Sequence, residues 1–225
     1  MFLPVTCPVC GALGAAPCPG CAAGLRRAPS LPAPVGVDTC TALLAYEGVG
    51  RDVVTRLKYR NARSSVPFLA DGLARLVVAE GLEIDVVTWA PTTTARRRER
   101  GFDQAELLAR AVARRLGRGV TCHPLLLRPP GPTQTGRTLE SRRHGPAFQP
   151  RCPCPPRVLL VDDVVTSGAT VAAAARALRA AGARQVHVLA AARTPRIRPR
   201  PAPRSPTSPA VGPTLPACGR VWVCG

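Results

Sequence analysis

Short apolar runs alternate with amphipathic stretches along the middle of the chain, between residues 41 and 193. The clearest apolar runs are Asp85–Ala90, Arg157–Val161 and Gln185–Ala192, and each is the length of a buried strand. The stretches between them are rich in Ala, Arg and Leu, as amphipathic helices are. This alternation is typical of βα units around a mainly parallel sheet, so we expect one α/β domain over residues 41–193.

Two of the predicted helices carry start and stop signals. Asp103 is a capping residue, Glu106 three positions later completes a capping box, and Gly117 ends the helix. The inward stripe of this helix is Leu107, Leu108, Ala111, Val112 and Leu116. A second, Ala-rich helix is expected from about Thr170 to Ala181, closed by Gly182, and its small side chains would let it pack close to a sheet.

The two ends of the chain differ in composition from the middle. Residues 1–30 hold paired cysteines, and a Pro-rich link follows at Pro29–Pro34. From residue 194 onward the sequence is Arg, Pro, Ser and Thr without periodicity. We therefore expect a metal-binding knuckle over residues 1–30 and a disordered tail over residues 194–225.

The paired cysteines predict a zinc site. Cys7 and Cys10 form one Cys-x-x-Cys pair, and Cys18 and Cys21 form another. Two such knuckles supply the four thiolates of a tetrahedral structural zinc site. Two local disulfides, or a redox pair without metal, are the alternatives. Six further cysteines show no matching spacing, and we expect them to be core or tail residues: Cys40, Cys122, Cys152, Cys154, Cys218 and Cys224.

Composition bounds the remaining possibilities. Of 225 residues, 46% are hydrophobic, which argues against wholesale disorder, and the formal net charge is +18. That charge permits nucleic-acid binding, but Lys58 is the only lysine, so a codon bias toward Arg accounts for it equally well. Pro and Gly interrupt the uncharged first 25 residues, and no 18-residue apolar run follows. We expect no membrane insertion and a cytoplasmic protein.

The candidate chemistry follows the strand at Arg157–Val161. Asp162 and Asp163 come at its carboxyl end, where ligands bind in open α/β sheets. A small, hydroxyl-rich loop then opens a helix, and its residues are Thr166, Ser167, Gly168, Ala169 and Thr170. Backbone N–H groups at a helix start bind phosphate, and adjacent carboxylates bind a ribose diol or Mg²⁺. The segment predicts a ribose-5-phosphate site, and the alternative is a plain Asp-Asp turn that caps a helix.

Other common sites lack their residues here. Lys58 lies in Leu-Lys-Tyr, not in a Walker A loop, and the chain has neither a GxGxxG fingerprint nor a GxSxG elbow. His123, His144 and His187 are isolated in the sequence, so no histidine is expected to act as a base. The run Arg96–Arg98 is either near the ligand or a solvated face.

Val158–Thr170 resembles the PRPP-binding signature of type I phosphoribosyltransferases. The block Arg98–Arg110 is similar to the "RERGFNQAELLAR" block of the ComF/GntX branch, whose members pair an N-terminal four-cysteine zinc motif with this domain. The resemblance covers about residues 5–193. It implies the type I phosphoribosyltransferase fold, with Mg²⁺ and PRPP at Asp162 and Asp163 and the 5-phosphate on the loop Thr166–Thr170.

The resemblance also implies the surrounding subsites. By matching position, the pyrophosphate would bind to Pro91, Thr92, Thr93, Arg98 and Arg100. A mobile hood would carry Gln134, Arg142 and Arg143. The chain departs from the family pattern in three places: Ala-Pro-Thr replaces Pro-Val-Pro in the pyrophosphate loop, Asp103 stands for Asn, and Gly145 ends the hood's usual Arg-x-x-Asn.

Two functions follow from these features. The chain is either a Mg²⁺-dependent phosphoribosyltransferase acting on an unidentified acceptor, or a non-catalytic PRPP- or nucleotide-binding module that serves DNA uptake in natural competence. The second function would add single-stranded DNA or competence proteins as partners.

Overall fold

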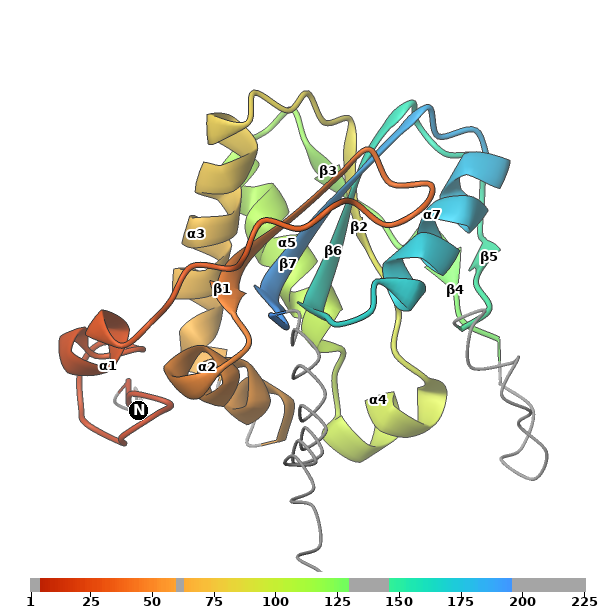
Figure 1. Ribbon diagram of the computed structural model, residues 1–225. Coiled ribbons are helices and arrows are strands. Elements are labelled where there is room, and N and C mark those ends of the chain that lie inside the picture. Colours follow the sequence, from red (N-terminus) through yellow and green to blue (C-terminus); the bar gives the residue numbers. More distant parts are fainter. Residues whose placement is uncertain (1–4, 60–62, 130–145, 196–225) are drawn as a thin grey trace, which may run out of the picture. The chain divides into compact units, whose positions relative to one another are not determined.

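The computed structural model describes residues 5–59, 63–129 and 146–195, and the fold below refers to these. Five parallel strands form the central sheet in the order β1-β7-β6-β2-β3 (Figure 1). The strands are β1 (Thr39–Ala45), β2 (Val86–Trp89), β3 (Thr121–Cys122), β6 (Arg157–Val165) and β7 (Gln185–Arg193). The expected parallel α/β sheet is confirmed.

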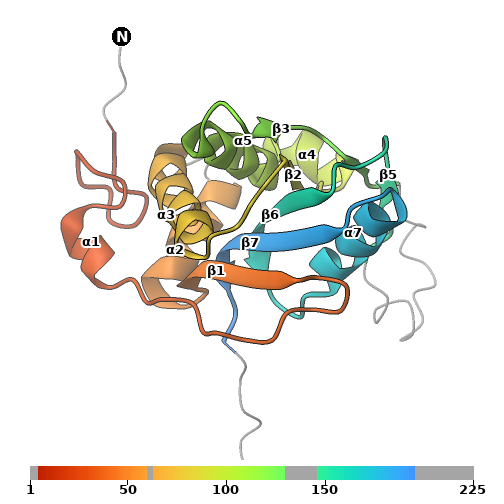
Figure 2. The ribbon, with the colours of Figure 1, turned by 90° about the horizontal axis from the view of Figure 1, so that it is seen from above.

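Helices cover both faces of this sheet. One face packs against α2 (Gly48–Tyr59), α3 (Val66–Ala79) and α5 (Gln104–Leu116). The other face packs against α7 (Ala169–Ala180) and a two-stranded antiparallel ribbon, β4 (Leu126–Leu127) with β5 (Gln149–Pro150). Figure 2 shows the two layers on opposite sides of the sheet. Three short helices complete the fold: α1 (Pro19–Ala23), a 3-10 turn at Arg63–Ser65, and α4 (Thr94–Arg100).

The strand pattern explains why the sheet is buried on both faces. Along β6, Val158 and Leu160 pack toward α7, while Leu159 and Val161 pack toward α3 and α5. Successive side chains of a strand point to opposite faces, so an uninterrupted apolar run is required when helices cover both. All four side chains are fully buried.

The two helices with capping signals form where the sequence predicts them. Asp103 caps α5, and its Oδ1 accepts hydrogen bonds from the backbone N–H groups of Ala105 (3.0 Å) and Glu106 (3.4 Å). The Ala-rich α7 spans Ala169–Ala180, within one residue of the expected bounds.

Two local features differ from the sequence-based picture. Strand β6 continues to Val165, so Asp162 and Asp163 lie within the strand and not after it; β7 pairs alongside as far as Arg193. The arginine run forms α4, which the periodicity did not reveal because none of its residues is buried. Thr93 caps α4, and Gly101 ends it in the left-handed conformation at φ 76°.

The N-terminal segment contacts the sheet through its backbone. The N–H of Ala45 donates to the carbonyl of Arg26 at 2.9 Å, and Arg27 forms an antiparallel bridge with Leu44. Val9 and Leu25 also pack against the core beneath α2 and α3. The segment is therefore held by both hydrogen bonds and apolar contacts. The region 194–225, predicted to be a tail, lies outside the described residues from position 196.

Candidate phosphoribosyl site

Asp162 and Asp163 lie near the carboxyl end of β6 and form the acidic centre of the site. Oδ1 of Asp162 accepts the backbone N–H of Asp163 at 2.8 Å, and Oδ2 of Asp163 forms an ion pair with Nζ of Lys58 at 3.0 Å. Both members of that pair are mostly buried, with 17% and 16% of their side chains exposed. Lys58 comes from the last turn of α2, so the fold brings the only lysine to the acidic pair.

Burial and charge make this acidic centre costly for the unliganded protein. Burial raises the pKa of Asp162 well above its ordinary value, and the neighbouring charge of Asp163 raises it further. The hydrogen bond from the Asp163 backbone and the charge of Lys58 act in the opposite direction. Burial therefore favours the neutral form of Asp162, and a bound cation would favour its ionised form.

The loop after β6, expected to bind the 5-phosphate, makes a tight turn into α7. Gly168 precedes α7 with φ 79°, and a Cβ placed on it would approach Cγ of Pro34 to 2.6 Å. Only glycine fits this combination of a left-handed backbone and a close neighbour. A small hollow lies against the loop and is lined by Thr166, Gly168, Ala169 and Thr170 together with Asp162. Ser167 is exposed, and its Oγ accepts the N–H of Ala169 at 3.4 Å.

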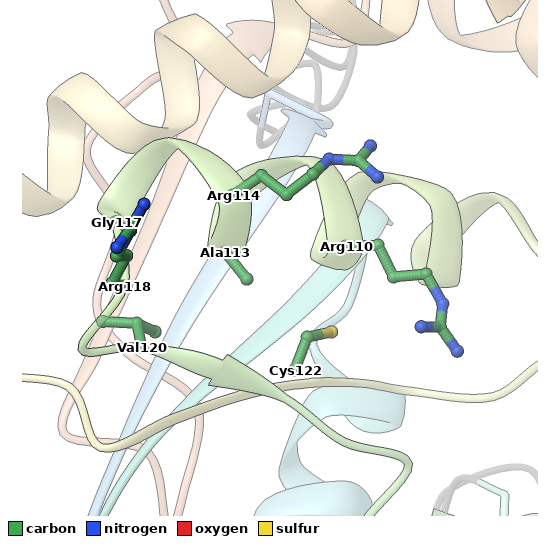
Figure 3. A pocket seen from close by; sticks show the side chains of 7 residues that line it. All are labelled: Arg110, Ala113, Arg114, Gly117, Arg118, Val120 and Cys122. Carbon is green, nitrogen blue, oxygen red and sulfur yellow. The ribbon is translucent and has the colours of Figure 1, made fainter.

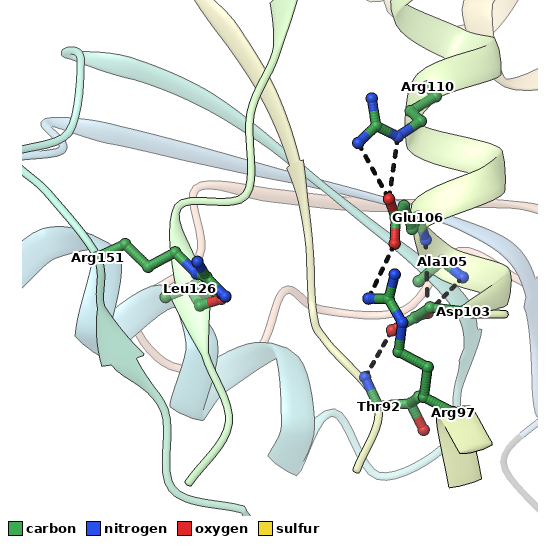
Figure 4. A network of polar contacts seen from close by, with 8 residues as sticks. All are labelled: Thr92, Arg97, Asp103, Ala105, Glu106, Arg110, Leu126 and Arg151. Carbon is green, nitrogen blue, oxygen red and sulfur yellow. Dashed lines mark hydrogen bonds and ion pairs between the residues drawn. The ribbon is translucent and has the colours of Figure 1, made fainter. Parts of the chain in front are cut away.

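A second loop, after β2, faces the acidic pair from the neighbouring strand. The backbone N–H of Thr92 donates to Oδ2 of Asp103 at 2.8 Å, which ties the loop to the start of α5 (Figure 4). Asp103 thus accepts three backbone N–H groups, from Thr92, Ala105 and Glu106. Burial raises the pKa of Asp103, although these hydrogen bonds oppose the shift.

Ion pairs extend this network along α5. Glu106 pairs with Arg97 of α4 at 3.2 Å and with Arg110, one turn further on, at 3.0 Å (Figure 4). On the opposite side of the same view, Nε of Arg151 donates to the carbonyl of Leu126 and links β4 to the segment after β5. Helix α4 is therefore joined to α5 by a charged contact as well as by the chain.

These elements enclose a polar cavity of about 240 Å³. The side chains around it come from α2, β6, the loop after β2, α4, α5, α7 and the residue that follows β4. The basic lining residues are Lys58, Arg96, Arg100 and Arg128, and the acidic ones are Asp103, Asp162 and Asp163. Thr92, Gln104 and Thr170 add neutral polar groups. Acidic residues at one strand end with four surrounding cations suit a ligand that combines hydroxyl groups with phosphate.

The structure brings together part of the predicted set. Asp162, Asp163, Thr92, Arg100 and Thr170 all line this cavity. Arg98 lies exposed on α4 and does not line it, while Pro91 and Thr93 flank Thr92 in the loop. The predicted hood residues Gln134, Arg142 and Arg143 lie outside the described residues.

The sequence-based prediction omitted several residues that line the cavity. Asp103, Gln104 and Arg128 were not assigned to the site, and Arg96 was left open between a ligand contact and a solvated face. Lys58 was considered as a Walker A lysine, a role that its sequence context excluded. The sequence did point to Asp103, because a residue that caps the start of a helix lies near the loop that leads into that helix. Arg128 gave none, since its position depends on how the strand ribbon folds back.

The four N-terminal cysteines converge as predicted. Their Sγ atoms all lie within 4.8 Å of one another, and those of Cys10 and Cys18 are 3.7 Å apart. Four sulfurs placed 2.3 Å from a central zinc in a tetrahedron would be about 3.8 Å apart. None of the eight cysteines in the described residues forms a disulfide, and the spacing suits a shared metal ion.

The ionisation of the cluster is uneven. Backbone N–H donation, chiefly from Cys18, lowers the pKa of Cys7 to about 6, while hydrogen bonding with Cys18 and burial raise the pKa of Cys21 to about 12.

A second cavity, of about 430 Å³, lies between α5 and β3, away from the acidic pair. Its floor is apolar, with Ala113, Val120 and Cys122, and Figure 3 shows Cys122 pointing from the strand toward the helix. Arg110, Arg114 and Arg118 stand around it. The cavity combines positive charge with apolar surface.

Comparison with known proteins identifies the same kind of domain. Residues 156–204 match the family model of the phosphoribosyl transferase domain. The chain is 32% identical over 200 residues to the DNA utilization protein YhgH of Salmonella typhimurium, and 31% identical over 200 residues to the protein of the same name from Salmonella typhi. Each alignment covers 84% of this chain and 84% of the relative.

The parallel sheet, the Asp-Asp pair in β6 and the match to the family model define a phosphoribosyltransferase-type domain. With the four-cysteine cluster before it and relatives aligned along most of its length, the chain belongs to the ComF/GntX-like family, which includes the DNA utilization protein YhgH. Across residues 5–59, 63–129 and 146–195, no helix has the length and apolar character needed to cross a bilayer.

Proposed function

We propose that the protein binds PRPP with Mg²⁺ and transfers its phosphoribosyl group to an acceptor, releasing pyrophosphate. The observation that carries this proposal is the meeting of three features at one sheet edge: the Asp162–Asp163 pair, the loop Thr166–Thr170, and a cation-lined loop after β2.

Each part of the donor would find a suitable partner. Asp162 and Asp163 hold the ribose hydroxyls and the metal, as carboxylate oxygens do for hard cations. The loop before α7 holds the 5-phosphate with backbone N–H groups, Ser167 and two threonines. Thr92, Arg96 and Arg100 surround the pyrophosphate, with Pro91 and Thr93 shaping the loop and Arg98 at its outer side.

The transfer needs charge stabilisation more than a nucleophilic side chain. As pyrophosphate leaves the anomeric carbon, positive charge grows on the ribose ring and negative charge on the leaving group. Buried carboxylates near the ring and guanidinium groups near the leaving oxygens stabilise both. Bound Mg²⁺ would neutralise pyrophosphate charge and orient it. Gln134, Arg142 and Arg143 would close over the donor and exclude water.

Lys58 has two uses at this site. Without ligand, its ammonium neutralises Asp163 at 3.0 Å. With a metal ion held by the carboxylates, Lys58 in the cavity wall would be available to add a cation near the pyrophosphate. The same side chain therefore compensates the acidic centre before binding and the leaving group afterwards.

Thermal denaturation with PRPP and Mg²⁺ tests the binding step. At a PRPP concentration about 100 times Kd, binding adds about 2.7 kcal/mol, which raises Tm by roughly 5–10 °C in a chain of this size. Asp163→Asn should remove the shift, and the exposed Asp52→Asn of α2 should keep it. An unchanged Tm for the wild type would refute the ligand site.

Pyrophosphate release across a panel of bases and amines tests the transfer. A transferase releases pyrophosphate with one of these acceptors and loses the activity in Asp163→Asn. Binding of PRPP without release across the panel would favour the non-catalytic module.

We also propose that Cys7, Cys10, Cys18 and Cys21 hold one structural Zn²⁺. Their Sγ positions suit four-thiolate coordination, and the short segment has little apolar bulk of its own. Metal binding would supply the energy that orders it. Metal analysis of the purified protein should give one equivalent of zinc.

A second candidate function is binding of single-stranded DNA for its uptake or use. Two observations favour it: the relatives are named DNA utilization proteins, and three arginines gather around the cavity between α5 and β3 (Figure 3). Clustered guanidinium groups suit the phosphate backbone of a nucleic acid. In this function the domain binds PRPP or a nucleotide at the acidic cavity, and the arginines around the cavity between α5 and β3 bind DNA.

Charge reversal at Arg114 and Arg118 tests the DNA candidate. Affinity for an oligothymidylate should fall steeply with salt in the wild type, with a shallower slope in Arg114→Glu/Arg118→Glu. The same variant should retain the PRPP-induced rise in Tm, since neither arginine lines the acidic cavity. DNA binding that is absent or insensitive to salt would exclude this function.

A further inference from the structure

Gln104 is a neutral polar residue in the wall of the acidic cavity whose hydrogen bonding is incomplete. It is the first residue of α5, only 2% exposed, and it lines the cavity together with Thr92 and Asp163. Its Oε1 accepts a hydrogen bond from Nη1 of Arg100 at 3.1 Å. Its Nε2 is buried and has no hydrogen-bond acceptor within the part of the chain that the structure describes.

The hydrogen bond with Arg100 determines the orientation of the Gln104 amide. A guanidinium group can only donate, so the atom facing Arg100 has to be the carbonyl oxygen. The NH₂ group must then lie at the other end of the amide. Asp103 holds the backbone at this point by capping α5, so the position of the side chain is fixed from both sides.

A buried donor without an acceptor is unfavourable by about 1–3 kcal/mol. Such groups are rare in native proteins and call for an explanation, and a ligand that completes the hydrogen bond supplies one. An oxygen acceptor that enters the cavity beside Gln104 would remove this penalty on binding, so the amide favours a ligand with oxygen at that point.

The neighbours of Gln104 indicate which ligand oxygen it meets. Arg100 comes from α4, and Asp103 next to Gln104 binds the backbone of Thr92, so Gln104 belongs to the side of the cavity formed by the loop after β2 and α4. The phosphate loop before α7 belongs to the next strand, β6. A cation-rich wall around an amide donor suits the pyrophosphate half of the donor better than its ribose phosphate half.

We infer that Gln104 is a pyrophosphate-binding residue: the Gln104–Arg100 hydrogen bond holds the amide so that Nε2 donates to a pyrophosphate oxygen of PRPP. This inference rests on the proposed PRPP site and assigns to it a residue that discriminates between the two ends of the ligand. A neutral donor binds a pyrophosphate oxygen without adding positive charge, which would slow the release of pyrophosphate.

Two substitutions isolate the donor. Gln104→Glu keeps the oxygen that Arg100 binds but loses the NH₂ group and adds a negative charge. Gln104→Met keeps the volume and the neutrality but loses both polar atoms. The two variants share only the loss of the donor, and the exposed Gln185 at the start of β7 provides the matched controls Gln185→Glu and Gln185→Met.

Isothermal titration with Mg²⁺-pyrophosphate and, separately, with ribose 5-phosphate gives the test. Both Gln104 variants should bind pyrophosphate at least tenfold more weakly than the wild type, because a hydrogen bond to a charged group contributes that much affinity. Ribose 5-phosphate affinity should stay within twofold, and both Gln185 variants should match the wild type for both ligands.

The possible failures are distinguishable. If the wild type binds neither probe, the proposed PRPP site is wrong. If the wild type binds both and the variants bind pyrophosphate within twofold of it, or lose both ligands equally, the role of Gln104 is wrong and the site stands.

A measurement on the wild type covers variants that fail to fold. In ¹⁵N-labelled protein, the side-chain NH₂ signals of Gln104 should shift on addition of Mg²⁺-pyrophosphate and stay in place with ribose 5-phosphate. If the protein binds pyrophosphate and the Gln104 NH₂ signals do not shift, the inference is wrong.

Discussion

Several polar side chains in the interior are paired with partners that the fold brings to them. Asp103 accepts three backbone N–H groups, Asp163 is neutralised by Lys58, and His187 on β7 meets Oγ1 of Thr39 through Nδ1 at 3.0 Å. The sequence showed Asp103 as a helix cap and His187 as an isolated histidine. Their partners 11 and 148 positions away depend on the fold.

Replacing Asp103 should loosen two elements at once. Asp103→Ala removes the cap of α5 and the bond to Thr92, and we expect a loss of about 1–3 kcal/mol in the free energy of unfolding, with weaker pyrophosphate binding. Asp103→Asn retains one acceptor oxygen and should lose less. Urea denaturation at pH 7 measures both, and equal stability of Asp103→Ala and wild type would contradict the bridging role.

His187 should make stability fall in mild acid. Burial lowers the pKa of His187, although Asp38 and Glu80 act in the opposite direction. Below the unfolded-state pKa of about 6.5, the unfolded chain therefore binds a proton more readily than the folded protein, and the free energy of unfolding decreases as pH falls through this range.

His187→Gln should flatten that dependence between pH 7.5 and 5.5 while preserving a side chain that can bond to Thr39. The exposed His123→Gln is the matched control and should follow the wild-type curve. Identical pH dependence in His187→Gln and wild type, measured by urea denaturation, would exclude His187 as its source.

Among the elements, the connection from β6 into α7 has the strictest sequence requirement. Gly168 has φ 79° and lies against Pro34, a residue of the segment that precedes β1. The Ala-rich sequence predicted that α7 packs closely, and the residues Thr166–Thr170 at its start predicted a phosphate-binding loop. The contact with Pro34 was not, because the two segments are far apart in sequence.

Gly168→Ala should destabilise the loop through both backbone strain and the clash with Pro34. Gly101→Ala, at φ 76° with open space around the new Cβ, carries the strain alone. We expect Gly168→Ala to lower the free energy of unfolding by about 1–3 kcal/mol more than Gly101→Ala, and to weaken ribose 5-phosphate binding. Urea denaturation and calorimetric titration check the two effects, and equal losses would remove Pro34 from the explanation.

In the whole molecule, the cysteine cluster and the α/β core share contacts. Val9 and Leu25 pack against the core, and Oγ of Ser64 donates to the carbonyl of Thr6 at 3.3 Å. A metal ion that orders residues 5–25 would therefore also support the region around α2, which supplies Lys58 to the acidic cavity.

Loss of the metal should destabilise both the N-terminal segment and the region around α2. Cys10→Ser should abolish stoichiometric zinc, lower Tm and raise amide exchange in residues 5–30 and in α2, whereas Cys40→Ser, outside the cluster, should keep one equivalent of zinc. Elemental analysis and hydrogen exchange measure this. Full zinc content in Cys10→Ser would contradict four-cysteine coordination.

The sequence by itself determined the features that depend on neighbouring residues. Alternating apolar runs predicted the parallel sheet, Asp103 and Gly117 predicted the bounds of α5, and the Cys-x-x-Cys pairs predicted the cluster. The Asp-Asp strand and the loop after it predicted the phosphoribosyl site, because both parts lie within one short segment.

Only the tertiary structure decided which distant residues complete that site. It brings Lys58 from α2 to Asp163, places Arg96 and Gln104 in the cavity wall, and leaves Arg98 outside. Periodicity reports which side of a helix is buried, but the exposed α4 has no apolar stripe to reveal it. Which of its arginines line the cavity is set by the packing of α4 against α5, and this contact joins residues through space.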